Sequence, residues 1–251
     1  MKPNSITAFF PACNDAGTIA NLVITALDVL SQITNDYEVL VVNDGSTDNT
    51  AAILNELARR HPARVRVIHH AQNRGYGAAL RSGFAHARKE WIFYTDGDGQ
   101  YDPWEVLDLV TALRPDTDVV NGYKVARCDP LYRIVVGWLY SHFARVVFGI
   151  RLRDVDCDFR LIRRAIFEHV ELESDTGTIC VEMIRKFQDI GCRFIEVPVS
   201  HYQRVFGTSQ FFCFRRLCHV AVHLARLWCK LFLLRPPLPQ PQPQSQRELN
   251  V

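Results

Sequence analysis

The sequence predicts an α/β fold in which a mostly parallel sheet is flanked by helices. Short runs rich in β-branched and aromatic residues alternate with helical patterns along the first half of the chain, and this alternation is typical of βαβ units. The chain has 251 residues, of which 48% are hydrophobic and 22% are charged, which is the composition of a folded globular protein. That length fits one large α/β domain, or one such domain with a short appendage.

The strands are expected in a regular order with helices between them. Ser46 and Thr47 precede a run of helical periodicity that extends to residue 60, and such residues are typical of a helix N-terminus. Pro103 stands near the first turn of a helix predicted at 102–113, where proline is favoured. The predicted strands lie at 5–10, 37–42, 64–69, 90–95 and 117–122.

Carboxylates follow three of these strands. Asp15 comes after the first strand, Asp44 after the second, and Asp96 with Asp98 after the fourth. In an open parallel sheet, ligands bind at the carboxyl ends of the strands, and carboxylates that converge there repel one another unless a cation is bound. The segment DGDG at 96–99 could instead be a solvated turn, but the recurrence of acids at three strand ends favours a metal site.

Charge and cysteine usage exclude several classes of function. The 29 Lys and Arg against 27 Asp and Glu give a net charge of +2, which argues against a nucleic-acid binder. The eight cysteines form no C-x-x-C pair and are expected to be reduced thiols of a cytoplasmic protein. The first apolar run is too short for a signal peptide.

Six segments, in their order and spacing, give the chain a specific resemblance. Together they resemble family 2 glycosyltransferases with the GT-A (Rossmann-like) fold, and within that family the polyprenyl-phosphate sugar transferases. The resemblance implies a catalytic domain over residues 1–210. The segments are FFPACNDAGTI (9–19), VVNDGSTDNT (41–50), NRGYGAALRSGF (73–84), YTDGDGQYDP (94–103), DVDCDFRLIRR (154–164) and EVPVSHYQRVFGTSQF (196–211).

The resemblance implies a role for each matching position. Asp96 and Asp98 would form the D-x-D pair that binds Mg²⁺ or Mn²⁺, with Gln100 as a third ligand. The metal would bridge the diphosphate of a nucleotide-sugar donor and neutralise the charge that develops on the leaving group. The nucleotide-sugar site would comprise Pro11, Asp15, Asp44, which reaches the base or ribose, and Arg204, which binds phosphate.

Four positions depart from the family pattern. Cys13 stands where the first motif usually has an aromatic residue, and Asp15 where it has a longer acid, so the packing around the nucleobase is altered. Gln210 replaces a lysine that often follows the G-x-S serine, which removes a cation from the phosphate region. Asp158 stands where a glycine is common, and this keeps a hydroxyl acceptor open as an alternative.

The acceptor decides whether a general base is needed. A sugar hydroxyl must lose its proton to a base, whereas a lipid monophosphate, with a second pKa of about 6, is already largely dianionic at neutral pH. Asp154, Asp156 or Asp158 could be that base, and Asp158 is the candidate catalytic residue beside the metal pair. The alternative is a structural loop in which these carboxylates pair with Arg151, Arg153 or Arg160.

Three cations lie next to the apolar segment 131–149 and are candidate ligands for an acceptor phosphate. They are Lys124, Arg127 and Arg133. Each of them could instead be a solvated cation on the surface. The segment 131–149 itself is apolar nearly all round, which suits a buried, membrane-facing or subunit-facing helix.

Residues 211–234 are predicted to form an amphipathic helix. Six basic residues lie within about 100° of one another on an otherwise apolar body, and this pattern favours a helix in a membrane interface, peripheral on the cytoplasmic face. The alternative is a helix packed on the domain with its basic edge in water. Residues 235–251 are Pro- and Gln-rich and are predicted to be disordered. The six basic residues are Arg215, Arg216, His219, His223, Arg226 and Lys230.

Three functions from different classes compete. The first is an inverting transferase that moves a hexose from GDP-mannose or UDP-glucose to a polyprenyl phosphate at a membrane surface. The second is an inverting transferase that acts on a hydroxyl of a glycan or glycolipid. The third is a non-catalytic nucleotide-binding module of Rossmann type, but Leu80 stands where its third glycine is needed. The oligomeric state is left open.

Overall fold

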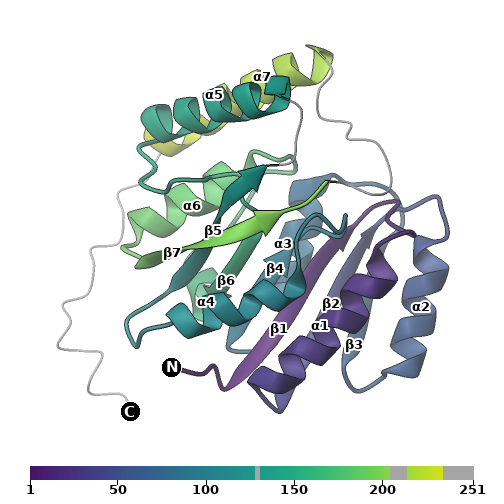
Figure 1. Ribbon diagram of the computed structural model, residues 1–251. Helices are drawn as coiled ribbons and strands as arrows, with labels where there is room; N and C mark the ends of the chain where they lie inside the picture. The colour runs from purple at the N-terminus through teal and green to yellow at the C-terminus, as the bar shows by residue number, and fades with distance from the viewer. Residues whose placement is uncertain (128–130, 204–213, 234–251) are drawn as a thin grey trace.

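The computed structural model describes residues 1–127, 131–203 and 214–233, and these residues form a seven-stranded sheet with helices on both faces (Figure 1). The strand order is β3-β2-β1-β4-β6-β5-β7. Within this sheet β6 runs antiparallel to β4 and β5, whereas the remaining pairs are parallel. The predicted α/β fold with a mostly parallel sheet is therefore confirmed.

Each of the five predicted strands overlaps an observed one, and two further strands were not predicted. β6 carries two arginines that interrupt the apolar run expected of a buried strand, and β7 lies at the sheet edge and includes Pro198, which a strand tolerates there. The strands are β1 (Ser5–Ala12), β2 (Asp36–Asp44), β3 (Val65–His70), β4 (Trp91–Thr95), β5 (Val119–Arg127), β6 (Phe159–Arg163) and β7 (Phe194–His201).

The helices divide between the two faces of the sheet. Buried side chains of α1, α2 and α4 pack on one face in a single apolar cluster, and those of α3 and α6 pack on the other. The helices are α1 (Ile19–Ile33), α2 (Thr50–Arg60), α3 (Tyr76–His86), α4 (Val106–Ala112), α5 (Leu131–Phe148), α6 (Ile179–Asp189) and α7 (Phe214–Phe232), with short 3₁₀ turns η1 (Pro103–Glu105) and η2 (Arg164–Glu168).

Helices α5 and α7 form a third layer beyond α6 (Figure 1). Leu224, Leu227 and Leu231 of α7 are buried against Phe148 of α5 and Ile184 of α6. The Lys230 ammonium of α7 also pairs with the Glu173 carboxylate. One apolar stripe of α7 therefore packs on the domain, which is one of the two arrangements expected from sequence. Other faces of α5 and α7 stay exposed.

Capping at two helix starts tests the sequence-based assignments. The Asp102 carboxylate accepts a hydrogen bond from Trp104 N at 3.0 Å, with Pro103 in the first turn of η1, as the position of the proline predicts. The expectation that Ser46 and Thr47 cap α2 is wrong. α2 begins at Thr50 after the N-cap Asn49, so Ser46 and Thr47 lie before the cap. Asp48 Oδ1 accepts from Thr50 N at 2.9 Å, and the Ser46 hydroxyl accepts from Asn14 N in the neighbouring loop.

Candidate active site

The acids that follow β1, β2 and β4 lie at one edge of the sheet. These three strands are adjacent and parallel in the order β2-β1-β4, so their carboxyl ends open on the same side. Asp15, Asp44, Asp96 and Asp98 are brought to this edge, which is where an open α/β sheet binds ligands. The strand-end prediction is thus confirmed as an arrangement of the chain.

Asp44 anchors the loop that joins β3 to α3. Its carboxylate is buried and accepts hydrogen bonds from Arg74 N and Gly75 N, both at 2.9 Å. Gly45 has φ +64°, and a Cβ there would collide with Asn73 N, so this close approach of the two loops requires glycine. Both carboxylate oxygens are engaged by the protein, and a contact of Asp44 with the base or ribose stays a prediction.

His70 connects Asp44 to α3. Its Nδ1 lies 2.6 Å from Asp44 Oδ1 and its Nε2 lies 2.9 Å from Ser82 Oγ. The side chains of His70 and Asp44 are only 5% and 4% exposed. This Ser–His–Asp chain was not predicted, because its members are separated by 12 and 26 residues in sequence and no local pattern links them. Its geometry fixes the orientation of Asp44 and hence of the loop.

The loop after β1 packs directly on the DGDG turn. Asp15 Oδ2 accepts from Cys13 N at 2.8 Å, and Thr18 Oγ donates to Gly97 O at 2.7 Å. A Cβ at Gly97 would lie 2.7 Å from Pro11 O and 3.3 Å from Asp15 Oδ2. Glycine is therefore needed at position 97, and Pro11 and Asp15 are held beside the predicted metal pair.

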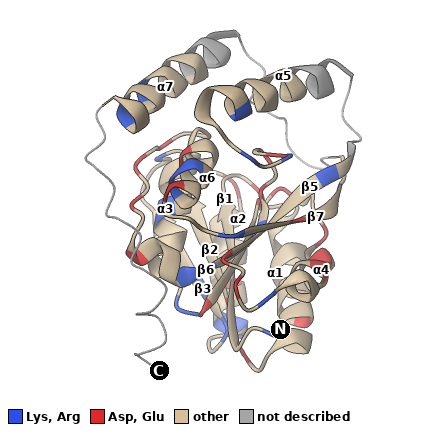
Figure 2. Cartoon of the chain, turned by 90° about the vertical axis from the view of Figure 1, so that its left-hand side faces the viewer, with Lys and Arg blue, Asp and Glu red and all other residues tan. Residues whose placement is uncertain are grey.

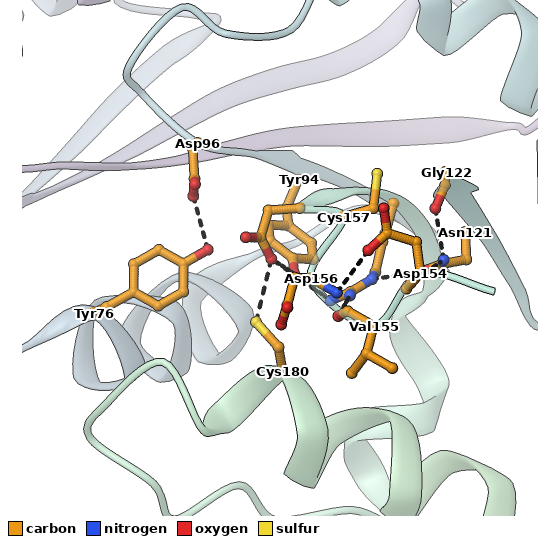
Figure 3. A network of polar contacts seen from close by, with 12 residues as sticks. Tyr76, Tyr94, Asp96, Asn121, Gly122, Asp154, Val155, Asp156, Cys157 and Cys180 are labelled. Carbon is orange, nitrogen blue, oxygen red and sulfur yellow. Dashed lines mark hydrogen bonds and ion pairs between the residues drawn. The ribbon is translucent and has the colours of Figure 1, made fainter. Parts of the chain in front are cut away.

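The carboxylates of Asp96 and Asp98 lie close to other acidic side chains. Tyr76 OH donates to Asp96 Oδ1 at 2.7 Å (Figure 3), and Gln100 N donates to Asp98 Oδ1 at 3.1 Å. Burial, and then the charges of Asp158 and Asp98, raise the pKa of Asp96 well above its usual range. A buried carboxylate whose charge is opposed by neighbouring acids fits a hard divalent cation, which would relieve this repulsion.

The donor set is incomplete from protein alone. Among the described side chains, no group of three or more His, Cys, Asp and Glu is arranged to hold a metal ion. Gln100, the predicted third ligand, donates its Nε2 to Tyr202 O at 3.0 Å and so ties this loop to the end of β7. Asp96 and Asp98 would then hold a cation that completes its shell with water and diphosphate oxygens, as expected for Mg²⁺.

The second carboxylate cluster lies where the loop before β6 meets β5. Asp154 is buried and accepts from Asp156 N at 3.1 Å and Lys124 N at 3.3 Å. Asp158 Oδ1 accepts from Tyr94 OH at 2.9 Å and from Cys180 Sγ at 3.2 Å. Figure 3 shows Asp156 near Tyr94 and Asp154 on the side of Asn121. Burial and the charge of Asp158 raise the pKa of Asp96, so this cluster lies next to the metal pair.

Arg160 is the buried counter-charge of this cluster. It is 1% exposed and donates to Asn121 Oδ1, Tyr94 OH and Val155 O, each at 2.5 Å. Its Nη1 lies 3.8 Å from Asp158 Oδ1, which confirms the predicted pairing with Arg160 for Asp158. Burial opposes the charge, but Tyr94 and the neighbouring acids raise the pKa of Arg160 well above its usual value, so it stays cationic.

Of the cations predicted to bind an acceptor phosphate, only Lys124 has a described side chain. The Lys124 ammonium donates to Asp156 O at 2.7 Å, so the alternative of a solvated surface cation is wrong for it. Burial lowers its pKa, but Asp154 and Asp156 outweigh burial and the pKa is raised overall. Arg204 and Gln210, as well as the side chains of Arg127 and Arg133, lie outside the described residues.

Comparison with known proteins decides the family. The sequence model named Glycosyl transferase family 2 matches residues 7–171, which include the three strand-end acidic loops and the second carboxylate cluster. The chain belongs to glycosyl transferase family 2. The predicted family membership is confirmed. The match does not support the alternative that the chain is a nucleotide-binding module of Rossmann type from another family.

Two similar proteins are named as sugar transferases or synthases of polyprenyl lipids. The chain is 30% identical over 183 residues to polyprenol monophosphomannose synthase of Mycolicibacterium smegmatis, covering 68% of this chain and 69% of that protein. It is 26% identical over 211 residues to undecaprenyl-phosphate 4-deoxy-4-formamido-L-arabinose transferase of Sodalis glossinidius, covering 84% of this chain. The chain matches only 64% of the length of that relative.

Solved structures confirm the GT-A fold of this family 2 protein. Glucosyl-3-phosphoglycerate synthase of Mycobacterium tuberculosis, in complex with Mn²⁺, UDP and glucosyl-3-phosphoglycerate, superposes with a TM-score of 0.64. The alignment covers 92% of this chain and 79% of that one at 18% identity. The same enzyme has been solved with Mg²⁺ and UDP, and this structure superposes with a TM-score of 0.65. At this identity the similarity establishes the fold alone.

Proposed function

We propose that this family 2 protein is an inverting glycosyltransferase that moves a hexose from a nucleotide-diphosphate sugar to a polyprenyl phosphate. The observation that supports it best is the Asp96/Asp98 pair beside Asp15, at the edge where three parallel strands end. The two relatives named above support a polyprenyl-phosphate acceptor. GDP-mannose and UDP-glucose are the proposed donors.

Each loop at the sheet edge has a part in donor binding under this proposal. Asp96 and Asp98 would hold Mg²⁺ or Mn²⁺, which would neutralise the charge that builds on the leaving diphosphate. The loop anchored by Asp44, together with Pro11 and Asp15, forms the nucleotide side. Arg204 is proposed to bind phosphate from the segment that follows Tyr202, to which Gln100 is hydrogen-bonded.

A donor screen tests the proposed reaction. Purified protein is incubated with a short polyprenyl phosphate, Mn²⁺, and one of GDP-mannose, UDP-glucose or UDP-N-acetylglucosamine. We expect one donor to give a lipid-linked sugar and the others little product. Nucleotide-sugar binding without any lipid-linked product from any donor would contradict the polyprenyl-phosphate acceptor.

The second candidate function is sugar transfer to a hydroxyl acceptor. The raised pKa of Asp156 favours it. Burial raises the pKa of the Asp156 carboxyl to about 7, which is where a general base is most effective at neutral pH. Asp158, the base expected from sequence, is already held by Tyr94 and Cys180. Under this alternative the acceptor hydroxyl would pass its proton to Asp156 as its oxygen attacks the sugar.

Helices α5 and α7 are proposed to rest on the cytoplasmic face of a membrane. Neither contains Asp or Glu, and Figure 2 shows them side by side with basic residues alone among their coloured positions. No helix in the described parts of the chain is both long and apolar enough to cross a bilayer. α5 exposes four large apolar side chains on one stripe, and an anionic lipid surface fits such a pattern. These four exposed side chains of α5 are Trp138, Leu139, Phe143 and Val146.

Vesicle binding tests this surface. Changing Phe143 and Val146, which are 49% and 69% exposed, to Glu should reduce binding to phosphatidylglycerol vesicles at least about tenfold, because two apolar contacts are lost and two anionic charges are added. The matched control is Ile24→Glu on α1, whose side chain is 48% exposed. Equal loss in the control, or no vesicle binding by the unchanged protein, would contradict the proposal.

His70 gives a test of the nucleotide side. We expect His70→Ala to raise the KM for the donor about tenfold with little change in kcat, since each lost hydrogen bond stabilises by about 1 kcal/mol and the Asp44 carboxylate would no longer be fixed. The exposed His61→Ala is the control. A donor KM and nucleotide affinity unchanged in His70→Ala, measured by calorimetry, would show that the Ser–His–Asp chain does not position this loop.

A further inference from the structure

Asp156 differs from the other acids of its cluster because its carboxylate has no hydrogen-bond partner among the described residues. Its backbone is held at both polar atoms: Asp156 N donates to Asp154 Oδ1 at 3.1 Å, and Asp156 O accepts from the Lys124 ammonium at 2.7 Å. Its side chain is half-buried. Because its backbone is fixed and its carboxyl group accepts no hydrogen bond from a described residue, this carboxyl group is placed for a ligand that approaches the cluster.

The surroundings of Asp156 set its charge state. Asp154 and Asp158 face it from its own loop, and Lys124 of β5 and Arg160 of β6 face it from the sheet. Burial raises the pKa of Asp156 to about 7, and Asp154 and Asp158 add to this rise while Lys124 and Arg160 oppose it. Among the described side chains, Tyr140 of α5, Cys180 of α6 and the adjacent Cys157 are further titratable groups nearby, and burial raises their pKa values, so they stay neutral near pH 7.

An acceptor phosphate that enters this cluster is repelled by the carboxylates there. The ionised carboxylates of Asp156 and Asp158 would repel a dianionic phosphate that approaches them. A protonated carboxyl removes one of these charges and supplies an O–H donor, and a hydrogen bond to a charged oxygen is of the strong kind. Asp156 is the member with a carboxyl group still available for this bond, because Asp154 and Asp158 are used by the protein.

We propose that Asp156 binds the acceptor phosphate as a neutral carboxylic acid, with its O–H donated to a phosphate oxygen and the Lys124 ammonium next to it. This inference rests on the proposed polyprenyl-phosphate acceptor. In the transfer step a phosphate oxygen bonds to the anomeric carbon, the bond from that carbon to the donor diphosphate breaks, and Asp156 keeps its proton throughout. A hydroxyl acceptor would require the opposite state, an ionised Asp156 that takes up a proton.

The two states predict opposite pH dependences. For a phosphate acceptor, binding is complete below about pH 7 and is lost as Asp156 ionises at higher pH. With a pKa of about 7, the protonated fraction falls about thirtyfold between pH 6 and pH 8.5, and the KM for the acceptor should rise by about the same factor. In Asp156→Asn the amide is a neutral donor at every pH, so this rise should disappear.

The experiment measures acceptor KM from pH 6 to pH 8.5 for the full-length protein, with a short polyprenyl phosphate and saturating donor. Asp28→Asn, at an exposed site on α1, is the matched control and should keep the thirtyfold rise. Calorimetry on the unchanged protein in two buffers of different ionisation enthalpy should detect uptake of about one proton per bound acceptor at pH 8. This second measurement does not depend on the stability of any variant.

The outcomes separate the inference from the proposed function. A flat KM in Asp156→Asn together with proton uptake in the unchanged protein supports the inference. An alkaline rise in KM that persists in Asp156→Asn, or acceptor binding without proton uptake, overturns it while transfer to polyprenyl phosphate still stands. Absence of lipid-linked product at every pH, with a hydroxyl acceptor used more rapidly as pH rises and not at all by Asp156→Asn, overturns both.

Discussion

Replacing Asp96 or Asp98 with Asn is expected to reduce sugar transfer by a factor of about 10²–10³. The two carboxylates are the proposed ligands of the cation, and loss of electrostatic stabilisation at a leaving group typically costs a factor of about 10²–10³ per interaction. The fall should appear in kcat, because the charge on the diphosphate develops in the transition state. Steady-state kinetics with the preferred donor and a titration of Mn²⁺ measure both the fall and the lost metal response.

Folding of these variants separates loss of chemistry from loss of structure. The pKa of Asp96 is raised in the folded protein, so its ionisation destabilises the metal-free fold as pH rises from its unfolded value towards its folded one. Asn removes this cost, and Asp96→Asn should be at least as stable as the unchanged protein at pH 7 without metal. Asp102→Asn, in the same loop but bonded to Trp104 N, should keep transfer within about threefold. Full transfer by Asp96→Asn would contradict the metal site.

Arg160→Met is expected to lower the free energy of unfolding by about 3–5 kcal/mol, the usual cost of breaking a buried ion pair from one side. The guanidinium donates three hydrogen bonds and lies beside Asp158. Met fills part of the volume but leaves Asn121 and the Asp158 charge without this partner. Urea denaturation measures the loss directly.

A surface arginine provides the comparison. Arg164, next to β6, is 41% exposed at its side chain and pairs with Glu168 at 3.6 Å, so Arg164→Met should change the free energy of unfolding by at most about 1 kcal/mol. If Arg160→Met were no more destabilising than Arg164→Met, the Arg160 network would not be the support of the second carboxylate cluster that its geometry indicates.

The sheet and its ligand edge were predictable because they depend on local patterns. Apolar runs of strand length alternate with helical periodicity, and the order of parallel βαβ units brings the ends of β1, β2 and β4 together. The acids at those ends therefore indicated the site before any coordinates. β6 was not predicted, since Arg160 and Arg163 interrupt its apolar run, and Arg160 is tolerated only because its partners surround it.

The parts of the site that sequence could not provide depend on contacts between distant residues. The bond between His70 and Asp44 joins residues 26 apart, and the bond between Tyr94 and Asp158 joins residues 64 apart. No local spacing records such pairs. Sequence singled out Asp158 from Asp154 and Asp156, and only the partners of these residues in the fold distinguish Asp154 and Asp158, which the protein engages, from Asp156.

The most direct test of the proposed acceptor compares two lipids that differ in one group. A polyprenyl phosphate and the corresponding polyprenol are offered at equal concentration, with the preferred donor and Mn²⁺, and the lipid-linked products are identified by mass. We expect sugar on the phosphate, no product from the alcohol, and no product from either lipid with Asp98→Asn. Sugar transferred to the alcohol and not to the phosphate would contradict the account.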